Sequence, residues 1–436
     1  MDKLGWHSLG ASFDCTCGVR HELPVRACHV GPDAAEWLAD YARDHCGRTA
    51  LLLADENTLN AAGDRVHRAL AAAGKCMLEK TYPAAPFEAT LERAQEVAAA
   101  GHIADFYVAI GAGTITDLAK YAGTEQNKPV LSYPTAASMN GYTSGIVALK
   151  IRGLKRTQPC RPVTGVFADP AVAATAPRRM IAAGVADFLS KCSSAADWHA
   201  AHLLRGDYYC RRPREFNEGI QEQIFASAAA IGRGEVDAVK LALEALILSG
   251  FGMVIAGSSA PASGGEHLIS HYLDMKHALY GTENDLHGIQ VGVGTVYCLG
   301  LWEKVLALDP AAIDADACVA AQPSPRAVRE AVMADWGAEV GAEVWEQWMQ
   351  KALNPRGLRR EIERFRAMLP ELRTLLAEDL QPAATVAKCI ETAGGAARPE
   401  DTQASIDEYY NALRRARFLR NRFTVLDLAA ELMLTP

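Results

Sequence analysis

The sequence predicts an α/β domain followed by a second domain that is nearly all helix. Over the first third of the chain, short apolar runs alternate with amphipathic stretches, which is the pattern of strands and helices in turn. After Pro170 the pattern changes to long helical periods rich in Ala, Leu, Glu and Arg. With 436 residues, half of them hydrophobic, the chain is long enough for two packed domains.

In the first part, the apolar runs predict strands at residues 49–53, 77–82 and 106–110, with helices at 59–73 and 89–101 between them. Strands joined through helices pair in parallel, so we expect an open parallel sheet covered by helices. In the second part, the periods predict helices at 182–204, 217–231 and 236–256. The Asp-Pro and Ala-Pro pairs between Asp169 and Ala183 mark the boundary, which gives domains 1–176 and 177–436.

Composition argues against several classes of partner. The net charge of -8 and the pI near 5.9 disfavour nucleic acid, whose backbone would be repelled. The amino terminus lacks the basic start and apolar core of a signal peptide, so we expect a cytoplasmic protein. The most apolar stretch, 241–257, contains Glu244 and three glycines, so it predicts a buried helix and no membrane span.

The eleven cysteines are scattered, which is typical of buried thiols in a reducing compartment. Cys15, Cys17 and His21, with His29 as a further donor, have the donor types that bind zinc. Their C-x-C-x3-H spacing lacks the second half of a structural zinc motif, however. An N-terminal β-hairpin with packed thiols is therefore the favoured interpretation.

The segment DFYVAIGAGTITDLAKYAG predicts a strand, a glycine turn and a helix that begins near Thr116. Backbone N–H groups and the positive helix end then converge on one point, which favours an anion. Gly111 and Gly113 let the backbone approach a pyrophosphate, and Asp117 is expected in the first helical turn. A tight turn without a ligand is the alternative. Asp55, at the end of an earlier strand, could bind a cofactor ribose or cap a helix.

The loop LSYPTAASMNGYTSG concentrates small polar side chains, which suits a pocket for a polar ligand. These side chains are Thr135, Ser138, Asn140, Tyr142, Thr143 and Ser144.

Histidine and carboxylate side chains in three later motifs indicate a metal site. In SGGEHLISHYLDM, His267 and His271 lie one helical turn apart on one face, and His287 follows in DLHGIQVGVG. Asp187, in GVADFLSK, is expected in the early turns of a long helix. Such ligands from three helices suit zinc, iron, nickel or manganese with one position left open. The alternative is that the histidines are satisfied core residues.

Five ordered motifs together resemble the glycerol-1-phosphate dehydrogenases, particularly their bacterial branch, within the dehydroquinate synthase and iron-containing alcohol dehydrogenase superfamily. They are GAGTITD, PTAASMNGYTS, GVADFLSKCSSAADW, SGGEHLISH and LHGIQVGVG. The resemblance implies an N-terminal Rossmann-like dinucleotide-binding domain, an all-α C-terminal domain and an active site between them. It also implies a homo-oligomer, a dimer or larger.

The resemblance also implies site roles. The metal, zinc, nickel or iron, would be held by Asp187, His267 and His287. Asn140, Asp187 and His271 would meet the substrate, with His271 and Asp187 as the catalytic residues. NAD(H) or NADP(H) would be bound by Asp55, Gly111, Ala112, Gly113, Thr114, Asp117, Thr135, Ser138 and Ser144.

The implied reaction interconverts a polyol or polyol phosphate and its ketone, best represented by sn-glycerol 1-phosphate and dihydroxyacetone phosphate. Asn140 departs from the family, which usually has an aspartate there, and this puts the substrate in question. Asp55 would repel a 2′-phosphate and so favours NAD. Two alternatives stay open: a dehydroquinate-synthase-like lyase or cyclase that uses NAD transiently, and a non-catalytic dinucleotide-binding module.

Overall fold

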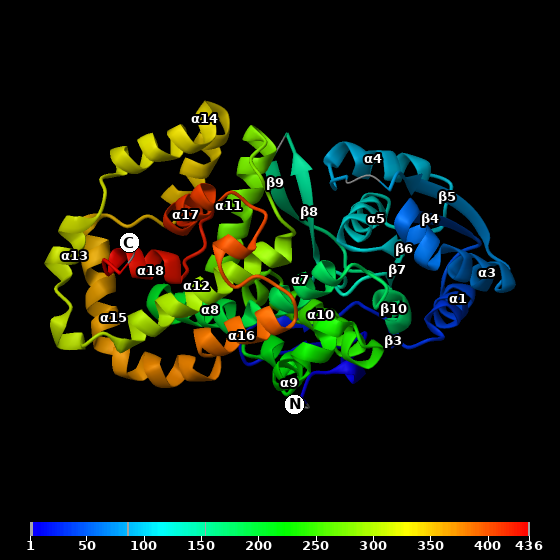
Figure 1. The fold of residues 1–436 in the computed structure, drawn as a ribbon, viewed down its shortest axis with the longest axis horizontal. Coiled ribbons are helices and arrows are strands. Elements are labelled where there is room, and N and C mark those ends of the chain that lie inside the picture. Colours follow the sequence, from blue (N-terminus) through cyan, green and yellow to red (C-terminus); the bar gives the residue numbers. More distant parts are fainter. Residues whose placement is uncertain (1–2, 85–86, 153, 435–436) are drawn as a thin grey trace. The chain divides into compact units, whose positions relative to one another are not determined.

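The computed structural model describes residues 3–84, 87–152 and 154–434, and the chain divides into two compact units (Figure 1). The first unit comprises residues 1–188, 210–259 and 392–395. The second unit comprises residues 189–209, 260–391 and 396–436. The first unit contains the sheet and the second is helical, as the sequence predicts.

The first unit is built on a six-stranded sheet in the order β3-β10-β7-β6-β4-β5, with every pair parallel. From β4 the chain moves to β5 on one side, and β6 and β7 then follow on the other side. The direction of winding therefore reverses between β4 and β6. The strands are β3 (Ala27–Val30), β4 (Thr49–Asp55), β5 (Cys76–Tyr82), β6 (Phe106–Gly111), β7 (Val130–Pro134) and β10 (Gly165–Ala168).

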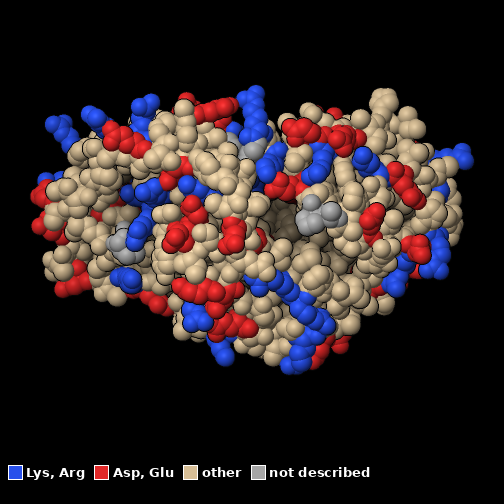
Figure 2. All heavy atoms as spheres, turned by 45° about the horizontal axis from the view of Figure 1, so that its top comes forward, with Lys and Arg blue, Asp and Glu red and all other residues tan. Residues whose placement is uncertain are grey.

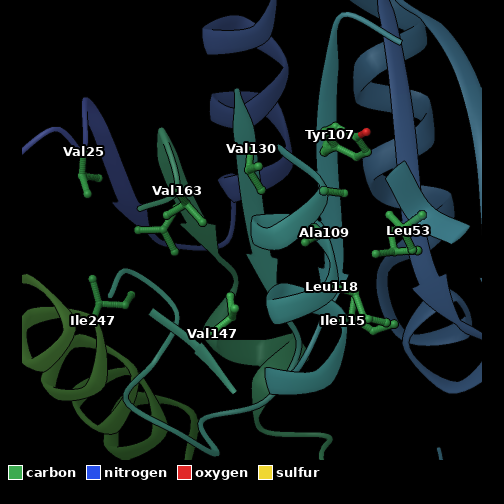
Figure 3. Close-up of a cluster of buried hydrophobic side chains, with 14 of the residues drawn as sticks. Val25, Leu53, Tyr107, Ala109, Ile115, Leu118, Val130, Val147, Val163 and Ile247 are labelled. Atoms are coloured by element: carbon green, nitrogen blue, oxygen red, sulfur yellow. The ribbon is translucent and has the colours of Figure 1, made fainter. Parts of the chain in front are cut away.

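Helices cover both faces of this sheet, because successive side chains of its apolar strands point to opposite faces. Leu52 packs with buried residues of α1 and α3, whereas Leu51 and Leu53 pack with those of α4 and α5. Figure 3 shows Leu53, Tyr107 and Ala109 of the strands lying among side chains of this second layer. The covering helices are α1 (Ala34–His45), α3 (Asp64–Ala72), α4 (Leu91–Ala100) and α5 (Gly113–Glu125).

Two antiparallel hairpins and further helices complete the first unit. The hairpins are β1 (Ser12–Asp14) with β2 (Arg20–Glu22), and β8 (Ile146–Ile151) with β9 (Leu154–Pro159). The helices are α2 (Glu56–Thr58), α6 (Pro170–Ala173), α7 (Arg178–Leu189), α9 (Ile220–Arg233) and α10 (Val236–Ala256), with short segments of other helix types at Trp6–Ser8, Leu59–Gly63 and Arg212–Asn217.

The second unit consists of helices and loops in the part of the chain that the structure describes. Its helices are α8 (Lys191–Arg205), α11 (Gly265–Tyr280), α12 (His287–Ala307), α13 (Ala315–Ala321), α14 (Pro325–Met349), α15 (Pro355–Leu375), α16 (Ala383–Thr392), α17 (Ile406–Arg415) and α18 (Val425–Glu431), with short 3-10 turns at Ala260–Ala262, Pro310–Ala312, Leu376–Glu378, Pro399–Asp401 and Ala416–Phe418.

The compact units do not follow the expected boundary at residue 176, because α9 and α10 fall in the first unit. Ile247, Leu248 and Phe251 of α10 belong to the same buried cluster as Leu51 and Leu53 of the sheet. The sequence of an apolar helix predicts that the helix is buried, but it does not predict which surface the helix packs against.

The helix predicted at 182–204 is wrong in one respect, because the chain breaks at Ser190 into α7 and α8. Asp187 consequently lies in the last turn of α7 and not in the early turns of a long helix. The helix expected near Thr116 begins at Gly113, so Asp117 lies in the second turn.

Among the described residues, one helix, α10, is long and apolar enough to cross a membrane by length and composition. Within the fold, 72% of that window is buried, as in the core helix of a globular protein. Figure 2 shows Lys and Arg side chains mixed with Asp and Glu across the face in view.

We expect Phe251→Ala to lower the free energy of unfolding by about 3–5 kcal/mol, since a fully buried ring would leave a cavity. Trp6 and Phe216 pack edge-on against this ring, with centroids 6.0 and 5.8 Å away. Chemical denaturation followed by circular dichroism measures the change. Val236→Ala is the control on the same helix, because Val236 is 46% exposed. Equal losses in the two variants would contradict the assignment of Phe251 to the core.

Candidate metal and dinucleotide sites

The carboxyl ends of β4, β6 and β7, which are neighbours in the sheet, carry the segments predicted to bind a dinucleotide. Gly111 ends β6 and pairs with Pro134 at the end of β7, so the glycine turn and the polar loop begin side by side. A Cβ atom on Gly113 would lie 3.2 Å from Met139 Cγ, which shows that the turn and the loop also touch further on. In open α/β sheets, ligands bind at this edge where the winding reverses.

Gly111, Ala112 and Gly113 form the turn into α5, and Ala112 is the residue that precedes the helix. The first N–H groups of α5, from Gly113 and Thr114 onward, have no acceptor within the helix and point out of its N-terminus. A Cβ on Gly111 would come within 2.7 Å of Ile115, so the turn excludes any larger residue there. This geometry suits an anion at the N-terminus of α5, a helix of 13 residues.

Asp117 and Asp55 have structural partners of their own. The Asp117 carboxylate accepts a hydrogen bond from the N–H of Ala148 at 3.0 Å, and burial raises its pKa. Asp55 caps α2: its side chain accepts from the N–H of Thr58 at 2.9 Å, and its own N–H donates to the Thr58 hydroxyl. The helix cap considered for Asp55 is therefore present, at the carboxyl end of β4 where a ribose would also bind.

A buried lysine that sequence reasoning missed fixes the polar loop. Lys120 is fully buried, and its ammonium group donates to the carbonyls of Gly141 at 2.8 Å and Ile146 at 2.7 Å and to the Ser144 hydroxyl at 3.2 Å. A lysine on an amphipathic helix usually lies in solvent, so only the crowded hydroxyls of the loop hinted at such a partner. Ser144 is consequently engaged inside the loop.

Two helices hold the same loop from other sides. The Thr143 hydroxyl donates to the carbonyl of Ile247 on α10 at 2.7 Å, and a Cβ on Gly250 would lie 2.1 Å from that hydroxyl. On α7, a Cβ on Gly184 would lie 2.0 Å from the carbonyl oxygen of Ala137. The glycine of the GVADF motif is thus a packing requirement. Near the loop's start, Thr135 is buried.

Polar groups of the loop bond one another and the Asp187 carboxylate. The Tyr142 hydroxyl, which lies 3.3 Å from that of Ser138, donates to the carbonyl of Ala136 at 2.6 Å. The N–H of Asn140 donates to Asp187 Oδ2 at 2.8 Å, in a buried contact. The Asn140 side chain is also buried, and its Nδ2 has no hydrogen-bond partner among the described residues. The loop therefore orients the carboxylate of Asp187 and aims an amide donor beside it.

In the second unit, the three predicted histidines form one cluster. His267 and His271 lie on α11, and His287 is the first residue of α12. The ring centroids of His267 and His287 are 5.2 Å apart, and His271 stacks on His287 at 5.8 Å with an interplanar angle of 15°. The sequence motifs thus identified residues that the fold brings together.

His267 and His287, the candidate metal ligands among these histidines, are both hydrogen-bonded through Nδ1. His267 Nδ1 lies 2.9 Å from the Glu266 carboxylate, so it must carry the proton and donate. The Ser270 hydroxyl donates to Gln290 Oε1 at 2.8 Å, and it therefore accepts from His287 Nδ1 at 2.8 Å. Each ring then presents the lone pair on Nε2, the form in which imidazole binds a metal.

Glu266, Ser270 and Gln290 were missed in the sequence, although Glu266 and Ser270 stand within the SGGEHLISH motif. Glu266 is fully buried, and its carboxylate also accepts the N–H of Gly264 at 2.6 Å. Asp197 lies nearby, and its burial together with Glu266 raises its pKa to about 8. A Cβ on Gly264 would lie 2.4 Å from Asp197 Oδ2, which explains this glycine.

Asp187 in the first unit and His267 and His287 in the second are the residues that each offer one ligand atom for a metal ion. Two of the three are buried, and His287 is half-buried. A carboxylate oxygen and two imidazole nitrogens are ligands that zinc, nickel and iron accept. His271, the third histidine of the cluster, stays a predicted substrate-facing residue.

Comparisons with known proteins agree with the fold and motifs. The family model for iron-containing alcohol dehydrogenase matches residues 29–177. The solved alcohol dehydrogenase from Oenococcus oeni is 14% identical with a TM-score of 0.56, over 94% of this chain and 98% of that chain. A probable glycerol dehydrogenase from Sinorhizobium meliloti is 18% identical with a TM-score of 0.53, over 80% and 98% of the two chains. These structures confirm the predicted fold.

Curated relatives are more similar in sequence. A glycerol-1-phosphate dehydrogenase, NAD(P)+, from Bacillus licheniformis is 32% identical over 312 residues, which cover 69% of this chain and 75% of the relative. A protein of the same name from Geobacillus stearothermophilus is 28% identical over 426 residues, covering 96% of both chains. The chain therefore belongs to the glycerol-1-phosphate dehydrogenase family of oxidoreductases, as its five motifs predict.

Proposed function

We propose that this chain interconverts sn-glycerol 1-phosphate and dihydroxyacetone phosphate with NAD(H) or NADP(H) and a divalent ion. The pair His267 and His287 carries the proposal, because their ring centroids lie 5.2 Å apart and the hydrogen bonds at Nδ1 leave the Nε2 lone pair of each ring to bind a metal. Asp187, whose carboxylate the polar loop orients, is the proposed third ligand. The family of the chain supplies the substrate class and the nicotinamide cofactor.

The donor set fits a catalytic metal. Two imidazole nitrogens and one carboxylate oxygen leave a coordination position open, which distinguishes catalytic sites from closed structural ones. When bound, the ion supplies Lewis acidity that stabilises negative charge on the reacting oxygen, and the nicotinamide supplies or accepts the hydride. Glu266 and Ser270 keep His267 and His287 in the orientation that this requires.

The dinucleotide is assigned to the carboxyl edge of the first unit's sheet. The N–H groups from Ala112 to Thr114 would bind the pyrophosphate, and Thr135 and Ser138 would line the nicotinamide side. Asp55 would accept hydrogen bonds from the adenosine ribose hydroxyls, and its charge disfavours a 2′-phosphate, so NAD is the preferred cofactor. Asp117 and Ser144 would act indirectly, since their side chains hold β8 and the polar loop.

The substrate is assigned to Asn140 and His271. The buried Asn140 Nδ2 is a donor for a substrate hydroxyl or phosphate oxygen, and a neutral amide does not repel a phosphate as an aspartate would. His271, stacked on His287, is placed to carry the proton to or from the substrate oxygen. A cytoplasmic homo-oligomer, which the sequence suggests, stays a prediction.

We expect His267→Ala to lower turnover of dihydroxyacetone phosphate by more than about 100-fold, because loss of a ligand costs more than loss of a residue that merely supports one. The measurement is NADH oxidation by metal-loaded protein. His277→Ala is the matched control, since His277 lies on the same helix but is exposed and bonds the carbonyl of Thr282.

Three results would contradict the proposal. Full activity of His267→Ala would remove the metal from the reaction. Turnover of another ketone only would make Asn140 the basis of a different specificity. Binding of metal and NADH without consumption of NADH by any ketone would favour the lyase or cyclase reaction.

Ser270→Ala should weaken metal binding by about 10–100-fold, because His287 would lose the acceptor that fixes its Nδ1 proton. Competition with a chromophoric chelator measures the affinity. Ser193→Ala, a buried serine on α8 with no role in the cluster, should leave the affinity unchanged. If both variants bound metal as the wild type does, the role given to Ser270 would be wrong.

A further inference from the structure

A second group of metal-binding side chains lies in the first unit, at the N-terminal hairpin. Cys15 and Cys17 lie in the turn between β1 and β2, His21 lies on β2, and Cys210 comes from the segment before the 3-10 turn Arg212–Asn217. We call these four residues the hairpin cluster. His21 and Cys210 are 2% and 3% exposed, and Cys15 and Cys17 are half-buried.

The fourth member explains why the sequence did not predict this cluster. C-x-C-x3-H supplies three donors, and the fourth lies 189 residues after His21. His29, considered as the further donor, lies elsewhere: its Nε2 is 2.7 Å from the Asp33 carboxylate, and its ring stacks on Trp37. The predicted hairpin itself is confirmed.

The distances within the hairpin cluster match a tetrahedral zinc site. A zinc ion with Zn–S of about 2.3 Å and Zn–N of about 2.0–2.1 Å places two sulfurs about 3.8 Å apart and a sulfur and a nitrogen about 3.5 Å apart. Cys15 and Cys210 Sγ are 3.8 Å apart. Cys17 and Cys210 Sγ lie 3.2 and 3.5 Å from His21 Nε2. All four ligand atoms lie within 4.8 Å of one another.

The same distances disfavour a disulfide and simple packing of thiols. The sulfurs of Cys15 and Cys210 are separated by far more than a bond of about 2.05 Å, and none of the chain's cysteines forms a disulfide. Three thiols and an imidazole converging on one point gain little from one another, because sulfur is a weak donor and acceptor. A shared cation would satisfy all four.

We propose that Cys15, Cys17, His21 and Cys210 bind a structural zinc ion. On binding, the three thiols release their protons to solvent, and three thiolates with one neutral imidazole complete the coordination. Four protein ligands leave no position for substrate, so this ion takes no part in hydride transfer. The hairpin cluster contains sulfur and the group around His267 contains none, so the two sites are chemically distinguishable.

The zinc ion would stabilise the β1–β2 hairpin within the first unit. β1 and β2 have three residues each, and an isolated two-stranded hairpin of this size is marginally stable in water. Zinc would tie its turn to Cys210 and so close a long loop of the chain, as a disulfide does in oxidising compartments. The hairpin is then part of the folded unit and not a loose N-terminal extension.

The test is cobalt substitution of the full-length protein. Purified chain is stripped of metal under reducing conditions and titrated with Co²⁺. The wild type should develop sulfur-to-cobalt charge-transfer absorption with the tetrahedral visible bands, at one such ion per chain. His267→Ala should keep these bands, because its site contributes no sulfur, whereas Cys17→Ser and Cys210→Ser should lose them.

Two controls guard against a general loss of folding. Cys76→Ser, at an exposed cysteine outside the cluster, should behave as the wild type. His21→Cys should create a four-sulfur site with stronger charge-transfer absorption, which is expected only if His21 is a ligand. Absence of sulfur-to-cobalt absorption in folded wild type would overturn the proposal. So would a Cys15–Cys210 disulfide in the mass spectrum of unreduced protein.

Discussion

The hydrogen bonds of the buried Lys120 ammonium group are the interaction on which the polar loop of the first unit depends. An unpaired buried charge costs several kcal/mol, and here the Gly141 and Ile146 carbonyls of the loop offset that cost together with the Asp117 carboxylate, which lies 3.9 Å away. The closed loop places the N–H of Asn140 on the Asp187 carboxylate. The buried ammonium group on α5 thus sets the position of the Asp187 carboxylate on α7 through the backbone of the loop, without direct contact.

In the second unit, His287 is oriented by neutral groups. Gln290 donates to the carbonyl of Asp285 and to Asn284, which directs its oxygen toward Ser270. The Ser270 hydroxyl in turn accepts the Nδ1–H of His287, which fixes the tautomer of that ring. Each unit therefore orients its own candidate ligands through hydrogen bonds within that unit.

How far the sequence could predict this structure depended on whether the signal was local. The strands β4, β5 and β6 and the helix α10 were predicted because their apolar patterns are complete within one segment. The short strands β3, β7 and β10 and the break at Ser190 carry no such pattern. Likewise, motifs revealed His267 and His287, but the partners that orient them, and Cys210 beside the hairpin, depend on contacts far apart in the chain.

The discontinuous first unit has a consequence for biosynthesis. Its sheet is complete once residue 168 has been made, yet the buried cluster on one face also needs Ile247, Leu248 and Phe251. A ribosome must therefore extend the chain through α10 before that face is covered. Until then an apolar surface stays exposed on the nascent chain, and a fragment that ends near residue 176 would lack part of its own interior.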